Sequence, residues 1–507
     1  MYREGISHGN GKVPYAVYGT WGAGYEINKN HLITFEATYS TNKTRNQATS
    51  VTQSSTENIT SEQILGETKD TLHYEMLNLS FNYTYTLPTK GKILLKADRL
   101  YATNYRHGIY NFDYKIAGDY TNNFTLSNSN RTIYTARADF IQPLRKDKDK
   151  FEAGIKTTFF RNTSLSDYRD FFNGVEMPTS VYVDNYHYRE NIWATYAKYT
   201  LNLGKFSLVG GLRFEYAELK PESRIHPEKN KNSYYADFFP ELAANYIWEK
   251  QKGHMVSLGY YRGIRRPPFG ALNPYIYPGS IDNFYIGNPY LRPEYMNTVE
   301  SNILLFGKYV IAIFYQQADN AIQTMTFNEP NTSILYHQQQ NTANRQDAIG
   351  FIQIPITLTK WWDLTLSGAY AYEYLQYTDQ IKDNHRISAG FQTSFKLPAK
   401  FNISVIGEWY NRLLVGNSIV RKPLTCTVKI NKIMCKDRLA CSFSIYDLFN
   451  AEGRMTNTIN GEQFNQWGRK SGYYGLFSLG VTYNFRWGDK IRVNRNEAGN
   501  KEERSRE

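Results

Sequence analysis

The chain lacks any run of about 18–20 consecutive apolar residues, which excludes a membrane protein built from spanning helices. No segment shows a sustained 3.6-residue period, so no substantial helix is expected. Cysteine is scarce as well. The chain has three cysteines among 507 residues, and this odd number excludes a complete disulfide framework. Their spacing matches no zinc-binding pattern, which excludes a structural zinc site.

Charge of one sign is not concentrated anywhere. Lys+Arg 59 against Asp+Glu 47 gives a net charge of +12, and the basic residues are scattered along the chain. Nucleic-acid binding needs a basic stripe or a recognition motif, so no nucleic-acid partner is expected. The excess positive charge is expected on loops and on the walls of a wet interior.

Catalytic and cofactor motifs are also missing. The nine histidines form no HxxxH or HxH pair, and the chain has no G-x-S-x-G elbow, no dinucleotide-binding G-x-G-x-x-G and no Walker A string. We therefore expect no catalytic residue, no metal and no cofactor, and the chain is not expected to be an enzyme.

Aromatic residues, in contrast, are abundant. They make up 16% of the chain (Tyr 43, Phe 28, Trp 8), although only 41% of residues are hydrophobic and the mean hydropathy is −0.58. So many rings require apolar surroundings, which excludes a disordered chain. Low hydropathy together with many rings is typical of strands whose residues alternate between two solvents.

Alternation with a period of two dominates the sequence. One strand carries Leu77, Leu79, Phe81 and Tyr83 with polar residues between them, and the same pattern recurs at 206–216 and 477–485. About 19 strands are predicted, centred near 20, 36, 80, 97, 136, 156, 194, 211, 243, 259, 301, 314, 346, 368, 390, 406, 425, 443 and 481.

The connections between these strands alternate between short turns and long loops. The predicted long loops are 43–68, 105–130, 163–186, 220–233, 266–296 and 449–473. The proline-rich loop 266–296 is expected to be too stiff to pair as a strand. Short turns at one end and long loops at the other are typical of bacterial outer-membrane barrels rather than of soluble sandwiches.

The two faces of the strands indicate the solvents. One row holds Leu, Val, Phe and Tyr, and the other mixes Ser, Thr and Asn with charges such as Arg137 and Asp139, which a lumen of about 20 strands accommodates. Aromatic residues gather at the strand ends, as a membrane-interface belt requires: Tyr18, Trp21, Trp248, Trp361, Trp362, Trp409 and Trp487. The sequence thus predicts an all-β, transmembrane, antiparallel up-and-down barrel that contacts lipid in the bacterial outer membrane, with long extracellular loops and short periplasmic turns.

Two features of the chain are open at this point. Cys426 and Cys441 lie symmetrically about a turn near Met434, so they are expected as cross-strand neighbours, either packed as small apolar side chains or bonded as a disulfide. No secretory signal is visible at the N-terminus, and 488–507 is expected to be a charged disordered tail after a barrel domain at 1–487.

Several strings in order carry a family resemblance. They are Arg265-Arg266-Pro267, Leu272-Asn273-Pro274, Gly287-Asn288-Pro289 with Leu291, Pro293-Glu294 and Tyr446-Asp447-Leu448-Phe449-Asn450. With the closing strand Val481–Phe485, they resemble the C-terminal barrel of Bacteroidota outer-membrane β-barrel proteins of the TonB-dependent receptor type. The resemblance implies 22 strands, a plug domain, a TonB-contacting segment and a signal peptide. None of the last three is visible. Strand parity indicates that an odd number of strands is absent upstream, and the 22 strands that the resemblance implies would make this about three strands plus the plug.

The resemblance implies TonB-dependent uptake of a nutrient ligand at the extracellular loops. Rings of the 266–296 loop are the candidate substrate-binding residues, namely Tyr275, Tyr277, Tyr285 and Tyr290, although they can equally pack the loop against the barrel mouth. Arg213, Glu215, Arg262 and Glu300 are the candidate lumen residues facing the plug. The alternatives are a plugless passive channel, a structural outer-membrane protein without active transport, and a soluble carbohydrate-binding protein. The ligand is not identified by the sequence.

Overall fold

The computed structural model describes thirteen stretches of the chain. They are residues 2–56, 59–177, 183–224, 227–274, 276–280, 283–328, 335–342, 344–377, 380–435, 438–451, 454–460, 465–471 and 476–483. In these residues, no helix has the length and the hydropathy needed to cross a membrane. The tail predicted at 488–507 lies outside the described residues.

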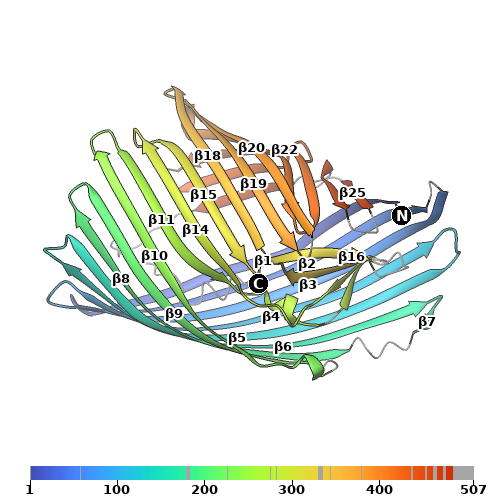
Figure 1. Ribbon diagram of the computed structural model, residues 1–507. Helices are drawn as coiled ribbons and strands as arrows, with labels where there is room; N and C mark the ends of the chain where they lie inside the picture. The colour runs from blue at the N-terminus through green and yellow to red at the C-terminus, as the bar shows by residue number, and fades with distance from the viewer. Residues whose placement is uncertain are drawn as a thin grey trace.

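One 22-stranded sheet forms the wall (Figure 1). It includes three short strands in the connections, namely β7 (Val175–Glu176), β24 (Thr456–Asn460) and β25 (Asn465–Ser471). The other nineteen follow one another as an antiparallel meander: β1 (Tyr2–Asn28), β2 (His31–Thr56), β3 (Ile59–Thr86), β4 (Lys92–Tyr114), β5 (Tyr120–Leu144), β6 (Asp149–Phe172), β8 (Asp184–Leu203), β9 (Phe206–Glu222), β10 (Ser233–Glu249), β11 (His254–Arg265), β14 (Glu294–Leu305), β15 (Tyr309–Asp319), β18 (Asn344–Thr359), β19 (Trp362–Tyr377), β20 (Gln380–Leu397), β21 (Phe401–Val415), β22 (Ser418–Met434), β23 (Leu439–Tyr446) and β26 (Leu476–Tyr483). Each predicted strand centre falls in one of these nineteen, so the predicted meander is confirmed.

The wall is apolar outside and polar inside. Outward side chains such as Leu212, Leu258 and Ile313 are 50–63% exposed, whereas the inward row buries Thr298 and Glu373 almost completely. A soluble sheet protein buries the opposite set. This arrangement matches a strand that faces hydrocarbon on one side and a polar interior on the other.

The predicted long loops are in large part strand, which corrects the sequence analysis. Strands β2 and β3 pair from His31↔Tyr85 to Thr56↔Ile59, so most of the predicted loop 43–68 is a hairpin arm. Likewise β4–β5 and β6–β8 extend into 105–130 and 163–186. Since about 9–11 residues cross a bilayer, a strand of 28 residues such as β3 extends far beyond it. There both faces meet water, the apolar row ends, and the periodic signal disappears while the backbone pairing continues.

The first strand lies beside the last connection (Figure 1). Strand β25 pairs in parallel with β1, starting at Tyr2↔Asn465, and β24 joins β25 to β22. Strand β26 pairs with β23 and runs in the same direction as β1. The hydrogen-bonded circuit around the barrel therefore passes through the connection after β23.

The register at the β22–β23 turn corrects the cysteine prediction. Cys441 pairs with Lys432 on β22, whereas Cys426 pairs with Gly407 on β21. The two cysteines are not cross-strand neighbours, because the turn is centred beyond Met434, and all three cysteines are free.

A second, four-stranded sheet lies within the barrel, between its long-stranded and short-stranded walls (Figure 1). Its strands, in spatial order, are β12 (Ile276–Ser280), β13 (Asn283–Ile286), β17 (Leu335–Asn341) and β16 (Ile322–Asn328). The helix α1 (Phe269–Leu272) precedes it, and two single-turn 3-10 helices, Pro227–Lys229 and Pro398–Lys400, lie in wall connections. The expectation that 266–296 cannot pair as a strand was wrong. Pro278 pairs with Phe284, which is tolerated because β12 is an edge strand.

Candidate functional site

A buried arginine fixes the point where the chain leaves the wall and enters the barrel. Arg266 follows β11 directly, and its side chain is 5% exposed. Its Nε lies 3.3 Å from Oε1 of Glu190 on β8, and its Nη2 donates to Oε2 of Glu215 on β9. Arg213 donates to the other oxygen of Glu215. Two arginines and two glutamates thus balance one another, which offsets the cost of burying each charge.

The next residues pack into an apolar cluster inside the barrel. The ring of Phe269 in α1 stacks on Phe160 of β6, with centroids 3.7 Å apart, and lies 5.9 Å from the ring of Tyr188. Wall and inner segment contribute to the cluster together: Met76, Leu100, Ala102, Ile133, Phe160, Tyr186, Tyr188, Ile192, Ala217, Leu219, Phe269, Leu272, Leu291 and Ile322. On this part of the wall the inward row is apolar, so the inner segment is held by burial as well as by charge.

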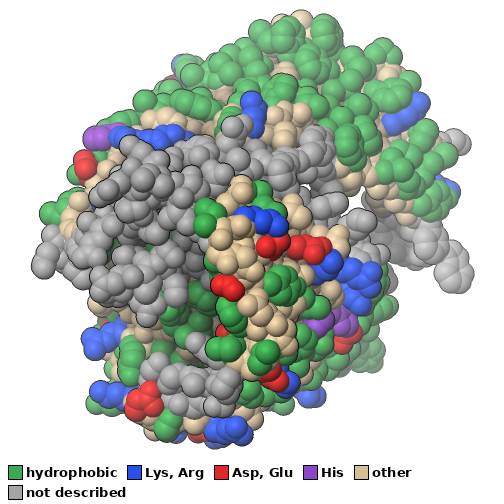
Figure 2. Space-filling model, turned by 90° about the vertical axis from the view of Figure 1, so that its right-hand side faces the viewer, with side chains coloured by type: hydrophobic (Ala, Val, Ile, Leu, Met, Phe, Trp, Pro, Cys, Tyr) green, Lys and Arg blue, Asp and Glu red, His purple; other side chains and the backbone are tan. Residues whose placement is uncertain are grey.

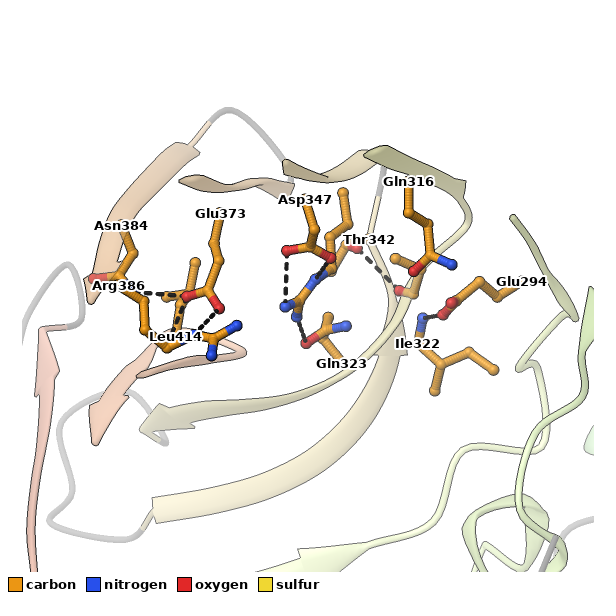
Figure 3. Close-up of polar contacts among 12 residues, drawn as sticks. Glu294, Gln316, Ile322, Gln323, Thr342, Asp347, Glu373, Asn384, Arg386 and Leu414 are labelled. Carbon is orange, nitrogen blue, oxygen red and sulfur yellow. Dashed lines mark hydrogen bonds and ion pairs between the residues drawn. The ribbon is translucent and has the colours of Figure 1, made fainter. Parts of the chain in front are cut away.

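Strand β16 of the inner sheet is tied at its start to the wall. Oε2 of Glu294 on β14 accepts the main-chain N–H of Ile322 at 2.7 Å (Figure 3). Glu294 is also paired with Arg265. The Arg265 guanidinium donates in turn to the carbonyl of Ile322 at 3.2 Å. Glu294 is nearly fully buried, so these bonds form out of water, where they are strongest.

Further contacts tie β16 along its length. Arg345 of β18 donates from Nη1 to Oε1 of Gln323 at 3.1 Å (Figure 3). The side-chain amide of Asn417, in the β21–β22 turn, makes two hydrogen bonds with the main chain of Thr326, at 3.1 and 2.7 Å. The strand therefore spans from β14 to the turn after β21, and the inner sheet is bound along β16 to the short-stranded wall.

The wall beside this strand is itself held by a buried carboxylate. Glu373 on β19 is 2% exposed and accepts from Nδ2 of Asn384 at 2.7 Å and from Nε of Arg386 at 2.9 Å (Figure 3). It also accepts the main-chain N–H of Leu414 at 3.2 Å, where the β21 ladder is irregular. Three donors on two neighbouring strands satisfy one charge and fix the local register.

A cavity of about 530 Å³ remains between the inner segment and the wall strands β4, β5 and β6. From the inner side it is lined by α1, β13, β16 and β17. The wall contributes short polar side chains and two arginines: Asn104, Arg106, Thr125, Ser127, Ser129, Arg131, Asn162, Ser164 and Ser166. The space exists because serines and threonines replace the large apolar residues that fill the neighbouring cluster.

The two charged side chains among the described lining residues, Arg106 and Arg131, are both arginines. Arg106 donates from Nε to Asp70 at 3.0 Å and from Nη2 to the hydroxyl of Tyr110 at 3.1 Å, which holds its guanidinium in place. Arg131 is 8% exposed. Among the described residues that line the cavity, none is an aspartate or a glutamate.

A histidine and a tyrosine of the inner sheet complete the lining. The rings of His337 and Tyr285 stack with centroids 4.9 Å apart, and Nδ1 of His337 lies 2.8 Å from Oγ1 of Thr326. Burial lowers the pKa of His337 because a charged imidazole is poorly solvated there, and burial likewise raises the pKa of Tyr285. Both side chains are therefore neutral at pH 7.

The lowered pKa of His337 predicts a pH-dependent stability. In the window below the ordinary histidine pKa of about 6.5, the unfolded chain binds a proton at this site more readily than the folded chain does. The stabilisation is thus present above that pH and is lost as the pH falls. Chemical unfolding followed between pH 7.5 and pH 5 checks this, since His337→Gln is expected to flatten the decline. Equal declines in the variant and the unchanged protein would contradict it.

The structure places the four predicted binding rings differently. Tyr285 lines the cavity, whereas Tyr290 is 56% exposed on the segment between β13 and β14. Tyr275 lies outside the described residues, and Tyr277 belongs to β12 with its side chain outside the description. A binding role for these rings remains a prediction.

The four predicted lumen residues also lie in different surroundings. Arg213 and Glu215 belong to the charge network around Arg266, and Glu300 shares its row on β14 with the buried Thr298. Arg262 shares its row on β11 with the exposed Leu258; its guanidinium lies 4.8 Å from the ring centroid of Tyr295 and 3.8 Å from Asp237. A plug-facing role for these four residues stays a prediction.

Sequence reasoning missed the cavity itself. Arg106, Arg131 and His337 were not among the candidates, and Arg266 appeared only within a family string. The available signal was the alternation of Thr125, Ser127, Ser129 and Arg131, which sits largely within the predicted loop 105–130.

The family model described as "Outer membrane protein beta-barrel family" matches residues 90–483. The chain belongs to this family. It is accordingly a β-barrel protein of the bacterial outer membrane, as its two-faced strands predicted. The comparison with curated proteins gives no match.

Solved structures of three transport proteins share the fold. The siderophore receptor PiuA from Acinetobacter baumannii is 10% identical, with a TM-score of 0.57, and the match covers 95% of this chain and 81% of that one. The FrpB iron transporter from Neisseria meningitidis is 11% identical (TM-score 0.52; 94% and 81% covered). The copper transporter OprC is 13% identical (TM-score 0.52; 94% and 83% covered). At these identities the likeness concerns the fold.

Proposed function

We propose that this member of the outer membrane β-barrel family is the barrel of a receptor that imports a nutrient ligand. The observation that carries the proposal is the cavity of about 530 Å³ between the wall and the inner sheet. A space of this size is typical of small-ligand sites, and its polar groups converge from the wall and the inner sheet. The similar structures that are described as a siderophore receptor, an iron transporter and a copper transporter support import rather than catalysis.

The proposed energy source and the further parts of the receptor rest on the family resemblance carried by the strings between Arg265 and Glu294. A plug domain and contact with TonB are expected of the whole receptor, and a Bacteroidota origin belongs to the same proposal. Because β1 and β26 run in the same direction, an antiparallel wall between them takes an odd number of further strands. Three such strands complete the 22 of the receptor type, with 1–487 as the barrel and 488–507 as a tail.

The position of the inner sheet argues against the alternative of a passive channel. The sheet lies between the two walls, and it and the segment before it are held by charged side chains at Arg266, Glu294 and Arg345, so a wide water-filled pore is not expected. Figure 2, which views the end where the N-terminus lies in Figure 1, shows charged side chains of both signs gathered beside hydrophobic ones.

Two measurements on protein purified from its native outer membrane test the proposal. We expect capture by the immobilised periplasmic domain of the host's TonB and no steady conductance in a planar bilayer, because the receptor opens only when pulled. Bovine serum albumin on the same matrix controls for unspecific capture. Steady conductance without capture would replace the proposal with a passive channel. If neither capture nor conductance were observed, the protein would be interpreted as a structural outer-membrane protein. That result would equally overturn the import proposal.

A further inference from the structure

The cavity between β4–β6 and the inner sheet also indicates what kind of ligand enters it. We propose that it binds a small hydroxylated anion, such as a sugar acid or a sugar phosphate, with the acid group at the arginines and the hydroxyls at the serine row. This inference names a substrate class and rests on the proposed import function.

The charge of the lining selects an anion. Arg106 and Arg131 both line the cavity, and no carboxylate among the described lining residues does, although Asp70 pairs with Arg106 from behind the lining. A guanidinium offers paired N–H donors that match the geometry of carboxylate and phosphate oxygens. Little water reaches Arg131, which is 8% exposed, so its charge is screened less than that of a surface arginine.

The same lining argues against a bare metal ion. Hard cations bind through several carboxylate or carbonyl oxygens, and softer ones through histidine and cysteine. The described residues contain no group of three or more such side chains arranged to hold a metal. His337 stands in the lining with arginines rather than with other ligands.

The short side chains of the wall select a hydroxylated ligand. Ser127 and Ser129 on β5 face the same space as Ser164 and Ser166 on β6, and a hydroxyl both donates and accepts a hydrogen bond. Asn162 already accepts from Ser129 at 2.8 Å, which orients part of this row. Such a surface matches a ring bearing several hydroxyls better than an apolar ligand.

The ring of Tyr285 provides the opposite side of the cavity. It is stacked on His337 and fixed to the inner sheet by the pairing of β13 with β17. Aromatic rings at ligand sites commonly pack against the apolar face of a sugar ring. The wall would then hold the hydroxyls and the acid group while the inner sheet covers the ring.

Calorimetric titration of the purified full chain tests this inference with three probes: glucuronate, glucose 6-phosphate and neutral glucose. We expect one or both anions to bind and glucose to bind at least tenfold more weakly. Arg131→Gln is expected to weaken anion binding by about 10- to 100-fold, the loss of a charged hydrogen bond, and to leave glucose unchanged. Arg131→Lys, which keeps the charge, is expected to recover part of the affinity.

The matched control is Arg169→Gln, because Arg169 pairs with Asp167 on an exposed arm and does not line the cavity. Arg106→Gln gives a second test if Arg131→Gln fails to fold, as judged by heat-modifiable migration. Equal binding of glucose and the anions, or no binding of any probe at millimolar concentration, would overturn the inference. Anion binding without capture by TonB would overturn the import proposal alone, so the two failures are distinguishable.

Discussion

Replacing Arg266 by methionine is expected to lower the free energy of unfolding by about 3–5 kcal/mol, the usual cost of breaking a buried ion pair. The guanidinium lies between Glu190 and Glu215, and all three side chains are at most 5% exposed. Methionine restores the apolar stem but leaves one carboxylate charge without its partner. The inner segment would also lose its anchor at the point where it leaves β11.

Denaturant unfolding of the full chain in lipid vesicles measures the loss, and limited proteolysis reports whether 268–292 becomes accessible. The matched control is Arg169→Met: its ion pair with Asp167 leaves the arginine 51% exposed, so the expected loss is at most about 1 kcal/mol. Adding Glu190→Gln to Arg266→Met is expected to recover part of the stability, because it removes the buried carboxylate charge that Arg266 balances, while Glu215 keeps its ion pair with Arg213. Equal losses in Arg266→Met and Arg169→Met would contradict the anchoring role.

The wall was predictable from the sequence because each strand meets two solvents. At Leu212 and Arg213 the apolar and charged rows alternate, and the structure turns the first outward and ties the second to a buried carboxylate. Nothing else is required to place a strand in a barrel wall. The short turns were likewise visible, since they interrupt the alternation with glycine, proline and charged residues.

The hairpin arms were not predictable in the same way. Above the membrane both faces of β2 and β3 meet water or polar neighbours, and the row of Thr, Ser and Asn in 43–56 carries no apolar period. Its strand conformation comes from pairing with the partner arm. A pairing between residues as distant as Thr41 and Glu75 is a tertiary fact that local sequence does not report.

The candidate site depended on the same non-local information. The cavity joins β4–β6 to residues 268–287 and 324–339, more than a hundred positions further along the chain. Sequence reasoning correctly gave weight to the strings around Arg266 and Glu294. It could not show that the first meets Glu190 and Glu215, or that the second accepts the main chain of β16.

Replacing Leu212 by arginine tests which face of the wall contacts lipid. Leu212 is the seventh residue of β9, so it lies about 20 Å along the strand from the short turn. With the usual strand tilt, this is near the middle of an apolar band about 25 Å tall. Its side chain is 50% exposed in the isolated protein and would contact lipid. We expect Leu212→Arg to cost about 2–4 kcal/mol of folding free energy in vesicles.

The matched control lies on the same side of the wall but beyond the bilayer. Tyr234 on β10 pairs with Glu218, about 40 Å along β9 from the turn, and is 75% exposed. Tyr234→Arg is therefore expected to cost at most about 1 kcal/mol, as charged residues do near or outside the interface. Denaturant unfolding and heat-modifiable migration of both variants measure the difference. If Leu212→Arg folded as well as Tyr234→Arg, the Leu212 row would have to face the lumen, and the inward charges of Arg213 and Glu215 would have to face lipid.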